Sequence, residues 1–195
     1  MEKQEVFPSF VLRLPDWVAP FLARAPSTYP TLESRMELVV ELARRNVAAG
    51  SGGPFGAAVF DLDAGRLLAP GVNLVLSAGC SVAHAEIVAL TLAQQVLGCY
   101  QLGLDGGRYE LVSSTEPCAM CLGAVPWSGV ARLVCGARDE DARAIGFDEG
   151  DKPAHWVESL QQRGIEVIRD VCCAEAAQVL RDYRDRGGEI YNGRR

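Results

Sequence analysis

The stretch Ser113-Ser114-Thr115-Glu116-Pro117-Cys118-Ala119-Met120-Cys121 decides how this chain is organised. Pro117 fixes its own φ and suits the first position of a helix, so we expect Cys118 and Cys121 in an opening helical turn. Their i, i+3 spacing puts both thiols on one face, and the helix dipole favours the thiolates that a metal binds. The two cysteines alone are equally compatible with a redox pair.

A second short motif upstream, Ala83-His84-Ala85-Glu86, supplies an imidazole nitrogen and a carboxylate. With His84, Cys118 and Cys121 as ligands, a catalytic zinc ion leaves its fourth position to water. Zinc lowers the pKa of such a water to about 7, and Glu86 is then the group that takes its proton and passes it to a leaving amine. The sequence therefore predicts one Zn²⁺ per chain and an acid–base role for Glu86.

The seven cysteines of the chain bear on both the metal site and the compartment. A closed structural zinc site would need Cys80 or Cys135 as a fourth ligand, and it would leave Glu86 unexplained. The count is odd and follows no regular framework, which favours reduced thiols in a cytoplasm. The remaining cysteines are interpreted as small core or surface side chains.

Composition places the chain among globular proteins of ordinary size. Its 195 residues are 49% hydrophobic and 23% charged, which is enough for one domain with a sizeable core. The sequence has neither an apolar run of spanning length nor a signal-peptide pattern in its first thirty residues, so we expect no membrane segment. The net charge of −6 makes nucleic acid an unlikely partner, because such proteins usually carry basic surfaces.

The hydrophobic pattern predicts an α/β fold. Residues 1–30, rich in proline with interspersed aromatics, are expected to be an extension packed on a single domain of residues 31–195. Helices are expected at 31–49, 84–97, 119–128, 153–163 and 174–186, and strands at 55–62, 66–74, 109–113, 130–135 and 165–168. Residues 77–82 and 139–150 are interpreted as loops. The result is a mixed five-stranded sheet with both halves of the metal site at helix N-termini.

Three further features allow two interpretations each. The glycine-rich stretch 51–57 lacks the ending of a phosphate loop, so it is a tight entry to a strand, a close backbone approach to a ligand beside Phe55, or both. Asn73 is either a turn residue or an amide that donates to and accepts from a ligand. Residues 187–195 begin with two glycines and carry Tyr191, so this tail is either a lid or a frayed end.

His84-Ala85-Glu86 together with residues 117–124 resembles the cytidine and deoxycytidylate deaminase superfamily, whose zinc signature is H-x-E…P-C-x-x-C. Within it, the chain is most similar to bacterial guanine deaminases at residues 52–57 and 97–102, at Trp127 and at residues 144–149. The resemblance implies a three-layer α-β-α sandwich around a five-stranded sheet.

The resemblance also implies roles for individual residues. It matches His84, Cys118 and Cys121 to the zinc ligands, with His84 also beside the substrate, and Glu86 to the proton shuttle. It matches Glu149 to a second acid near the departing amine, although composition alone favours a solvated charge there. The residues matched to substrate contacts are Phe55, Asn73 and Trp127, and the tail prediction adds Tyr191.

The expected reaction is zinc-dependent hydrolytic deamination of a free nucleobase, with guanine giving xanthine and ammonia. Alternatives are a deaminase of cytosine, a pterin or a triazine, a tRNA adenosine deaminase, or a catalytically silent relative. The family resemblance further implies a homodimer that can exchange C-terminal segments, and a cytoplasmic role in purine catabolism.

Overall fold

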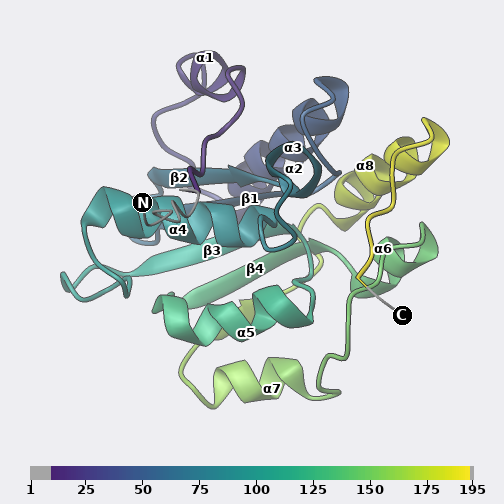
Figure 1. The fold of residues 1–195 in the computed structure, drawn as a ribbon. Coiled ribbons are helices and arrows are strands. Elements are labelled where there is room, and N and C mark those ends of the chain that lie inside the picture. Colours follow the sequence, from purple (N-terminus) through teal and green to yellow (C-terminus); the bar gives the residue numbers. More distant parts are fainter. Residues whose placement is uncertain (1–9, 194–195) are drawn as a thin grey trace, which may run out of the picture.

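The computed structural model describes residues 10–193 and contains a mixed five-stranded sheet, as the sequence predicted. The strands lie in the order β2-β1-β3-β4-β5, of which Figure 1 labels the first four. Strand β1 is antiparallel to β2 and β3, whereas β3, β4 and β5 run parallel. The strand bounds are β1 Gly56–Asp61, β2 Leu67–Val72, β3 Tyr109–Thr115, β4 Arg132–Ala137 and β5 Glu166–Ile168.

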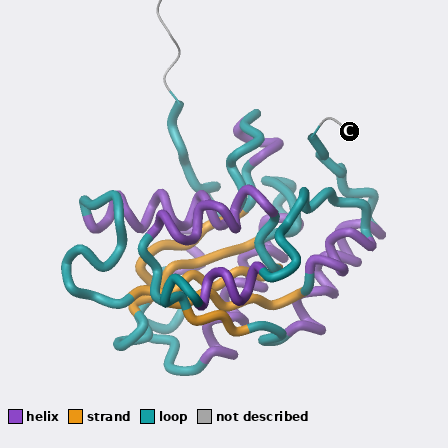
Figure 2. The backbone as a smooth tube through the Cα atoms, turned by 90° about the horizontal axis from the view of Figure 1, so that it is seen from below, coloured by secondary structure: helices purple, strands orange, loops and turns teal. Residues whose placement is uncertain are grey.

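Helices cover both faces of the sheet (Figure 2). The strands alternate their side chains between two cores, because successive residues of a strand point to opposite faces. Val112 and Val134 pack with helices α2 Leu32–Ala48 and α8 Cys173–Asp185. Leu111 and Leu133 pack with the helices on the other face, α4 Ala85–Leu97, α5 Ala119–Ser128 and α7 Trp156–Gln161. The α-β-α sandwich is thereby confirmed.

One predicted helix start is confirmed, and two short helices lie in segments that were predicted to be loops. Thr31 and Ser34 form the capping box that opens α2. A short helix, α3 Val75–Ala78, overlaps the start of the predicted 77–82 loop. A helix, α6 Asp139–Ala144, lies where the acidic stretch 139–150 predicted only a loop. The Asp141 carboxylate accepts from the backbone N–H of Arg138 (2.9 Å), and acidic groups stabilise a helix N-terminus.

The described part of the N-terminal extension, residues 10–30, begins beside α4 and continues along the α2 side of the domain. It contains one short helix, α1 Val18–Leu22, and the side chains of Trp17 and Phe21 contact the core of that side. The Trp17 indole N–H donates to Ser51 Oγ at 3.0 Å, and the Arg45 guanidinium lies 4.3 Å from the Phe21 ring centroid. No helix among residues 10–193 is both long and apolar enough to cross a membrane.

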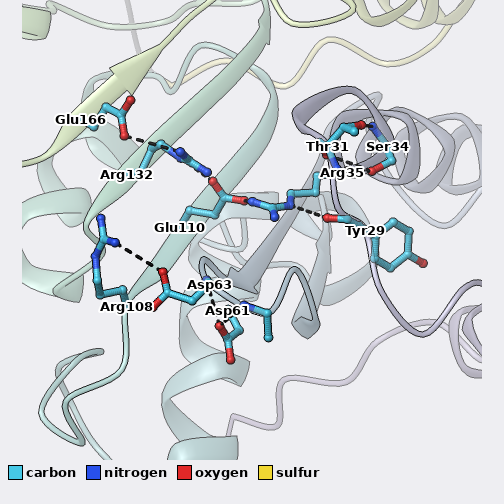
Figure 3. A network of polar contacts seen from close by, with 11 residues as sticks. Tyr29, Thr31, Ser34, Arg35, Asp61, Asp63, Arg108, Glu110, Arg132 and Glu166 are labelled. Carbon is cyan, nitrogen blue, oxygen red and sulfur yellow. Dashed lines mark hydrogen bonds and ion pairs between the residues drawn. The ribbon is translucent and has the colours of Figure 1, made fainter.

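A buried ion cluster joins α2 to the sheet (Figure 3). The Glu110 side chain on β3 is fully buried and pairs with Arg35 of α2 and with Arg132 of β4, whose Nε lies 2.6 Å from Oε2. Arg35 Nε also donates to the Tyr29 carbonyl at 2.7 Å. The partly exposed Glu166 lies 3.5 Å from Arg132 at the rim. Removing one partner from such a buried ion pair leaves the other charge uncompensated, and this strongly lowers the free energy of unfolding.

Candidate active site

Two helix N-termini meet on one face of the sheet and bring three ligand-type side chains together. His84 is the N-cap residue of α4, Cys118 is the N-cap residue of α5, and Cys121 lies in the first turn of α5. One ligand atom from each of these residues lies within 4.8 Å of the others. Pro117 precedes the cap rather than occupying the first helical position, so that detail of the sequence prediction is wrong; the spacing of the two sulfurs is unaffected.

The protonation of the two cysteines differs because they share a proton. A hydrogen bond from Cys121, with a further one from His84, lowers the pKa of Cys118 to about 4 despite burial. The same bond to the Cys118 thiolate, together with burial, raises the pKa of Cys121 far above its usual range. Two sulfurs and one imidazole nitrogen are a donor set that suits zinc. Binding zinc through both sulfurs would release the Cys121 proton.

Glu86, in the first turn of α4, lines the same cavity as His84 and Cys118. Its side chain is buried, and burial raises its pKa, with the negative charge of Cys118 adding to the shift. A carboxyl with a raised pKa beside the sulfur and nitrogen donors holds a proton more readily than a solvated one and can both accept and return it. This placement matches the acid–base role predicted for Glu86.

Glu149 lies in the same cavity, which has a volume of about 440 Å³. Burial raises the pKa of Glu149 to about 8, and the negative charges of Cys118 and Glu86 act in the same direction. Its backbone carbonyl accepts from the N–H of Ala119 at 2.9 Å. Lys152 Nζ donates to the Pro117 carbonyl at 3.2 Å. The loop that carries Glu149 is therefore fastened to the start of α5.

Aromatic rings form an apolar wall of the cavity. The Phe55 and Phe147 centroids are 5.0 Å apart, and those of Phe147 and Tyr191 are 5.1 Å apart, both in edge-to-face arrangements. The chain after α8 returns toward α6 (Figure 1). Asn192 fixes it there, since its Oδ1 accepts from the Asp148 N–H and its Nδ2 donates to the Gly146 carbonyl, each at 2.9 Å. The tail thus lies over the cavity of its own chain.

Three polar atoms of cavity-lining residues have no hydrogen-bond partner within the described part of the chain: Asn73 Nδ2, Thr115 Oγ1 and Tyr191 Oη. Asn73 Oδ1 accepts from the Val75 N–H at 3.2 Å, so the amide nitrogen is the atom left to donate. Buried polar groups are normally satisfied, so these three atoms are available to bond a polar ligand in the cavity.

Comparisons with known proteins agree with this geometry. The family model of the cytidine and deoxycytidylate deaminase zinc-binding region matches residues 30–137. The chain belongs to this deaminase family. Zinc-dependent hydrolytic deamination is the chemistry expected of its members, and the His/Cys/Cys cluster is a candidate site for the metal.

Three individual relatives show the kinds of deaminase that the chain resembles. The guanine deaminase of Bacillus subtilis is 40% identical over 63% of this chain and 78% of its own length. A solved structure described as guanine deaminase from Nitrosomonas europaea is 46% identical, covers 92% of this chain and 100% of its own, and superposes with a TM-score of 0.85. The tRNA-specific adenosine deaminase of Haemophilus influenzae is 39% identical over 77% of this chain and 82% of its own length.

The structure does not bring Trp127 into the cavity, so its expected place as a pocket aromatic is corrected for this chain. Trp127 is at the C-terminal end of α5 and is 84% exposed, whereas the cavity opens at the N-terminal end of that helix. The ring of Phe147 takes the place beside Phe55 instead. Phe147 lies two residues before Glu149, and that proximity was a signal that sequence reasoning could have used.

Other cavity residues were missed because no local pattern marks them. Thr115 was quoted within the cysteine motif, but only the alternation along β3 shows that its side chain faces the cavity side of the sheet. Asn192 lies between Tyr191 and Gly193 in a short tail, and its bonds to residues 146 and 148 are tertiary.

Proposed function

We propose that this chain deaminates free guanine hydrolytically to xanthine and ammonia. The observation that carries the proposal is one cavity in which a buried acid–base carboxyl beside a His/Cys/Cys set shares the space with a second buried carboxyl and an unpaired amide donor. The likeness to two guanine deaminases supports this choice of base.

Complementary hydrogen bonding favours guanine among the amino-heterocycles. Guanine presents two adjacent donors, the ring N1–H and the exocyclic amine on C2. Glu149 only accepts when it is ionised, and the positive charge of a bound zinc ion would favour that form against the burial that raises its pKa to about 8. Asn73 Nδ2 can donate to an acceptor elsewhere on the ring, because its Oδ1 is already engaged. Phe55 and Tyr191 supply faces and edges against which a flat purine can pack. Cytosine lacks the pair of adjacent donors and would not use Glu149 in this way.

The reaction replaces the amine of guanine by an oxygen from water. Zinc, held by His84, Cys118 and Cys121, would supply a water acidified toward neutral pH. Glu86 accepts a proton as the water oxygen bonds to C2, and it delivers that proton to the neighbouring ring nitrogen. Glu86 then takes the remaining proton of the hydroxyl added at C2 and, with Glu149, passes it to the amine; the C2=O bond forms as the C2–N bond breaks, so ammonia departs and the ring becomes xanthine.

We further propose a homodimer that uses an exposed apolar stripe on α5. Met120, Gly123 and Trp127 recur at i, i+3 and i+7 and face away from the core. Tyr100, 78% exposed, belongs to the segment that meets the C-terminal end of α5, where the Leu102 N–H donates to the Ser128 carbonyl at 2.7 Å. Such a patch marks an association surface. In this proposal each tail closes its own cavity, and no exchange of C-terminal segments is required.

The residues 1–30 and 31–195 would form one unit in the cytoplasm, where the seven free cysteines stay reduced. The reaction consumes a purine base, so it belongs to purine catabolism. A second candidate, tRNA adenosine deamination, is favoured by the likeness to the Haemophilus influenzae enzyme. The net charge of −6 counts against it, because RNA binding draws on basic surface.

The test is ammonia release by the zinc-loaded protein from guanine, guanosine, cytosine, adenine and pterin at equal concentration, with an adenosine-containing tRNA anticodon hairpin as a sixth substrate. We expect guanine to be turned over fastest. Faster release from the hairpin or from another heterocycle would replace the substrate assignment. Release from none of them would leave the silent relative as the better description.

A further inference from the structure

Asn46, near the C-terminal end of α2, is a fully buried amide outside the cavity. Its Nδ2 donates to two backbone carbonyls, that of Gly53 at 3.0 Å and that of Asn73 at 2.8 Å. Gly53 belongs to the segment that leads to Phe55, and Asn73 follows β2. One side chain therefore fastens together two segments that each place a cavity residue.

The orientation of this amide is fixed by a chain of hydrogen bonds from the N-terminal extension. The Trp17 indole N–H donates to Ser51 Oγ at 3.0 Å, and Ser51 Oγ donates to Asn46 Oδ1 at 2.8 Å, the nearer of its two acceptors. The reversed amide would direct its oxygen at two carbonyl oxygens and its nitrogen at a hydroxyl donor. The order of donation is thus Trp17 to Ser51 to Asn46.

The segments that carry the cavity residues Phe55, Asn73 and Tyr191 meet beside Asn46. The Asn73 N–H donates to the Phe55 carbonyl at 3.1 Å, so Asn73 is held through its N–H, its carbonyl and its side-chain oxygen. A side chain at Gly52 would come within 1.9 Å of the Asn73 carbonyl oxygen. A side chain at Gly53 would come within 2.0 Å of Tyr191 Oη. The backbone at Gly52 and Gly53 therefore packs directly against Asn73 and Tyr191, with no room for a side chain at either glycine.

We propose that Asn46 is a positioning residue for base recognition and that the N-terminal extension acts on the cavity through Trp17 and Ser51. Without the two bonds from Asn46, the carbonyl of Asn73 and the segment before Phe55 separate, and the free amide donor of Asn73 moves from its place. Loss of these bonds weakens base binding more than it slows the chemical step, because neither Glu86 nor the His/Cys/Cys set is hydrogen-bonded to this chain of residues. The inference rests on the proposed deaminase function.

The test compares Asn46→Asp, Trp17→Phe and Phe21→Leu in the zinc-loaded full-length protein. Asn46→Asp preserves shape but replaces two donors by an oxygen that repels the carbonyls, and Trp17→Phe removes only the indole donor. Phe21→Leu is the matched control, since it weakens packing of the same extension, including the contact with the Trp17 ring, but removes no donor or acceptor from the chain of bonds. We expect the KM for guanine to rise about tenfold in Asn46→Asp and about threefold in Trp17→Phe, with kcat within about threefold of the parent. We expect no change of KM in Phe21→Leu and unchanged zinc content in all three.

A purely structural role predicts a different pattern. Fewer folded molecules would lower the apparent kcat and leave KM unchanged, and that result would overturn the proposal. If Asn46→Asp does not fold, the test uses Ser51→Ala instead. Ser159→Ala is then the control, because it removes a hydrogen-bonded serine hydroxyl from α7, on the opposite face of the sheet. In Ser51→Ala the added Trp17→Phe change should have no further effect on KM; an equal further rise would contradict the chain of bonds. Should the parent prefer another heterocycle, the proposed function fails and the same KM comparison is made with that heterocycle.

Discussion

His84 Nδ1 lies 3.5 Å from Cys118 Sγ, although the two residues are 34 positions apart in the sequence. The contact exists because each residue caps a helix that starts at the same edge of the sheet and packs on the same face. The dipoles of both helices favour negative charge at this edge, which helps to keep the sulfur ligands as thiolates.

The first prediction follows from this arrangement: the purified protein holds one zinc ion per chain. The double variant Cys118→Ala, Cys121→Ala removes both sulfur donors and should bind no zinc at stoichiometric concentration. Metal analysis after gel filtration measures both. A control is Cys99→Ala, which lies outside the cluster and should keep the metal. Zinc retained in the double variant would contradict the assigned ligands.

The second prediction concerns Glu86. Glu86→Gln keeps the volume of the side chain and leaves the three ligand residues intact, so zinc content and fold should persist. Because a general acid–base group typically contributes about 10²–10⁴-fold, we expect turnover to fall by at least about that factor. Ammonia release at saturating substrate measures it. Unchanged turnover would mean that a different group moves the proton.

The third prediction concerns the recognition of guanine by Glu149. Glu149→Gln places a donor against the donors of guanine, so guanine turnover should fall at least tenfold, or about 1.4 kcal/mol of transition-state stabilisation. Zinc content should be unchanged. A variant that deaminates guanine at the parent's rate would remove Glu149 from the mechanism.

The same variant has a pH signature in the metal-free protein. Burial raises the pKa of Glu149 from 4.5 to about 8, so the folded state binds this proton more tightly than the unfolded chain. The free energy of unfolding contributed by Glu149 is therefore present below pH 4.5 and is lost as pH rises toward about 8. Relative to the parent, Glu149→Gln should gain stability between pH 5 and pH 8, as measured by urea unfolding after zinc removal. A difference that does not change with pH would contradict the buried position of the carboxyl.

How much of this could be predicted from the sequence depends on the range of the interactions. Alternating and helical periodicities predicted the strands of the sheet and the main helices, since those patterns are local, whereas the three-layer arrangement was implied by the family resemblance. The short helix at Asp139 was missed because acidic residues suit a loop and a helix N-terminus equally. Trp127 was misplaced because its role was carried over from the family resemblance, although the cysteines already put the metal site at the opposite end of α5. Asn46 follows two arginines in a helical pattern, and nothing in that run reveals that its amide is buried against Asn73.

The fourth prediction concerns the buried ion cluster. Glu110→Gln leaves Arg35 buried without its counter-charge, so we expect the free energy of unfolding to fall by about 3–5 kcal/mol. Glu166→Gln removes only the exposed end of the same cluster, and a rim pair of this kind contributes about 0–1 kcal/mol. Urea denaturation of the two variants gives the comparison. Equal losses would show that burial of Glu110 does not control the strength of the cluster.

The last prediction tests whether the hydroxyl of Tyr191 serves the ligand. Within the described residues this hydroxyl is buried with no hydrogen-bond partner, while the ring packs against Phe147. Deleting residues 189–195 would remove the packing together with the hydroxyl, so Tyr191→Phe is the sharper variant. Without ligand it should be as stable as the parent or more stable by up to about 1 kcal/mol, because an unsatisfied buried polar group costs free energy.

With substrate the sign should reverse. If Tyr191 Oη bonds the bound base, its loss removes a hydrogen bond in a water-poor site, and the KM for guanine should rise about fivefold to tenfold. Thermal unfolding of the ligand-free protein and initial-rate kinetics measure the two effects on one preparation. Tyr183→Phe is the control, since its hydroxyl donates to the Glu189 carbonyl at 2.7 Å and its loss should lower stability without the same rise in KM. If Tyr191→Phe loses stability and keeps its KM, the hydroxyl has a partner within the protein and the tail does not take part in recognition.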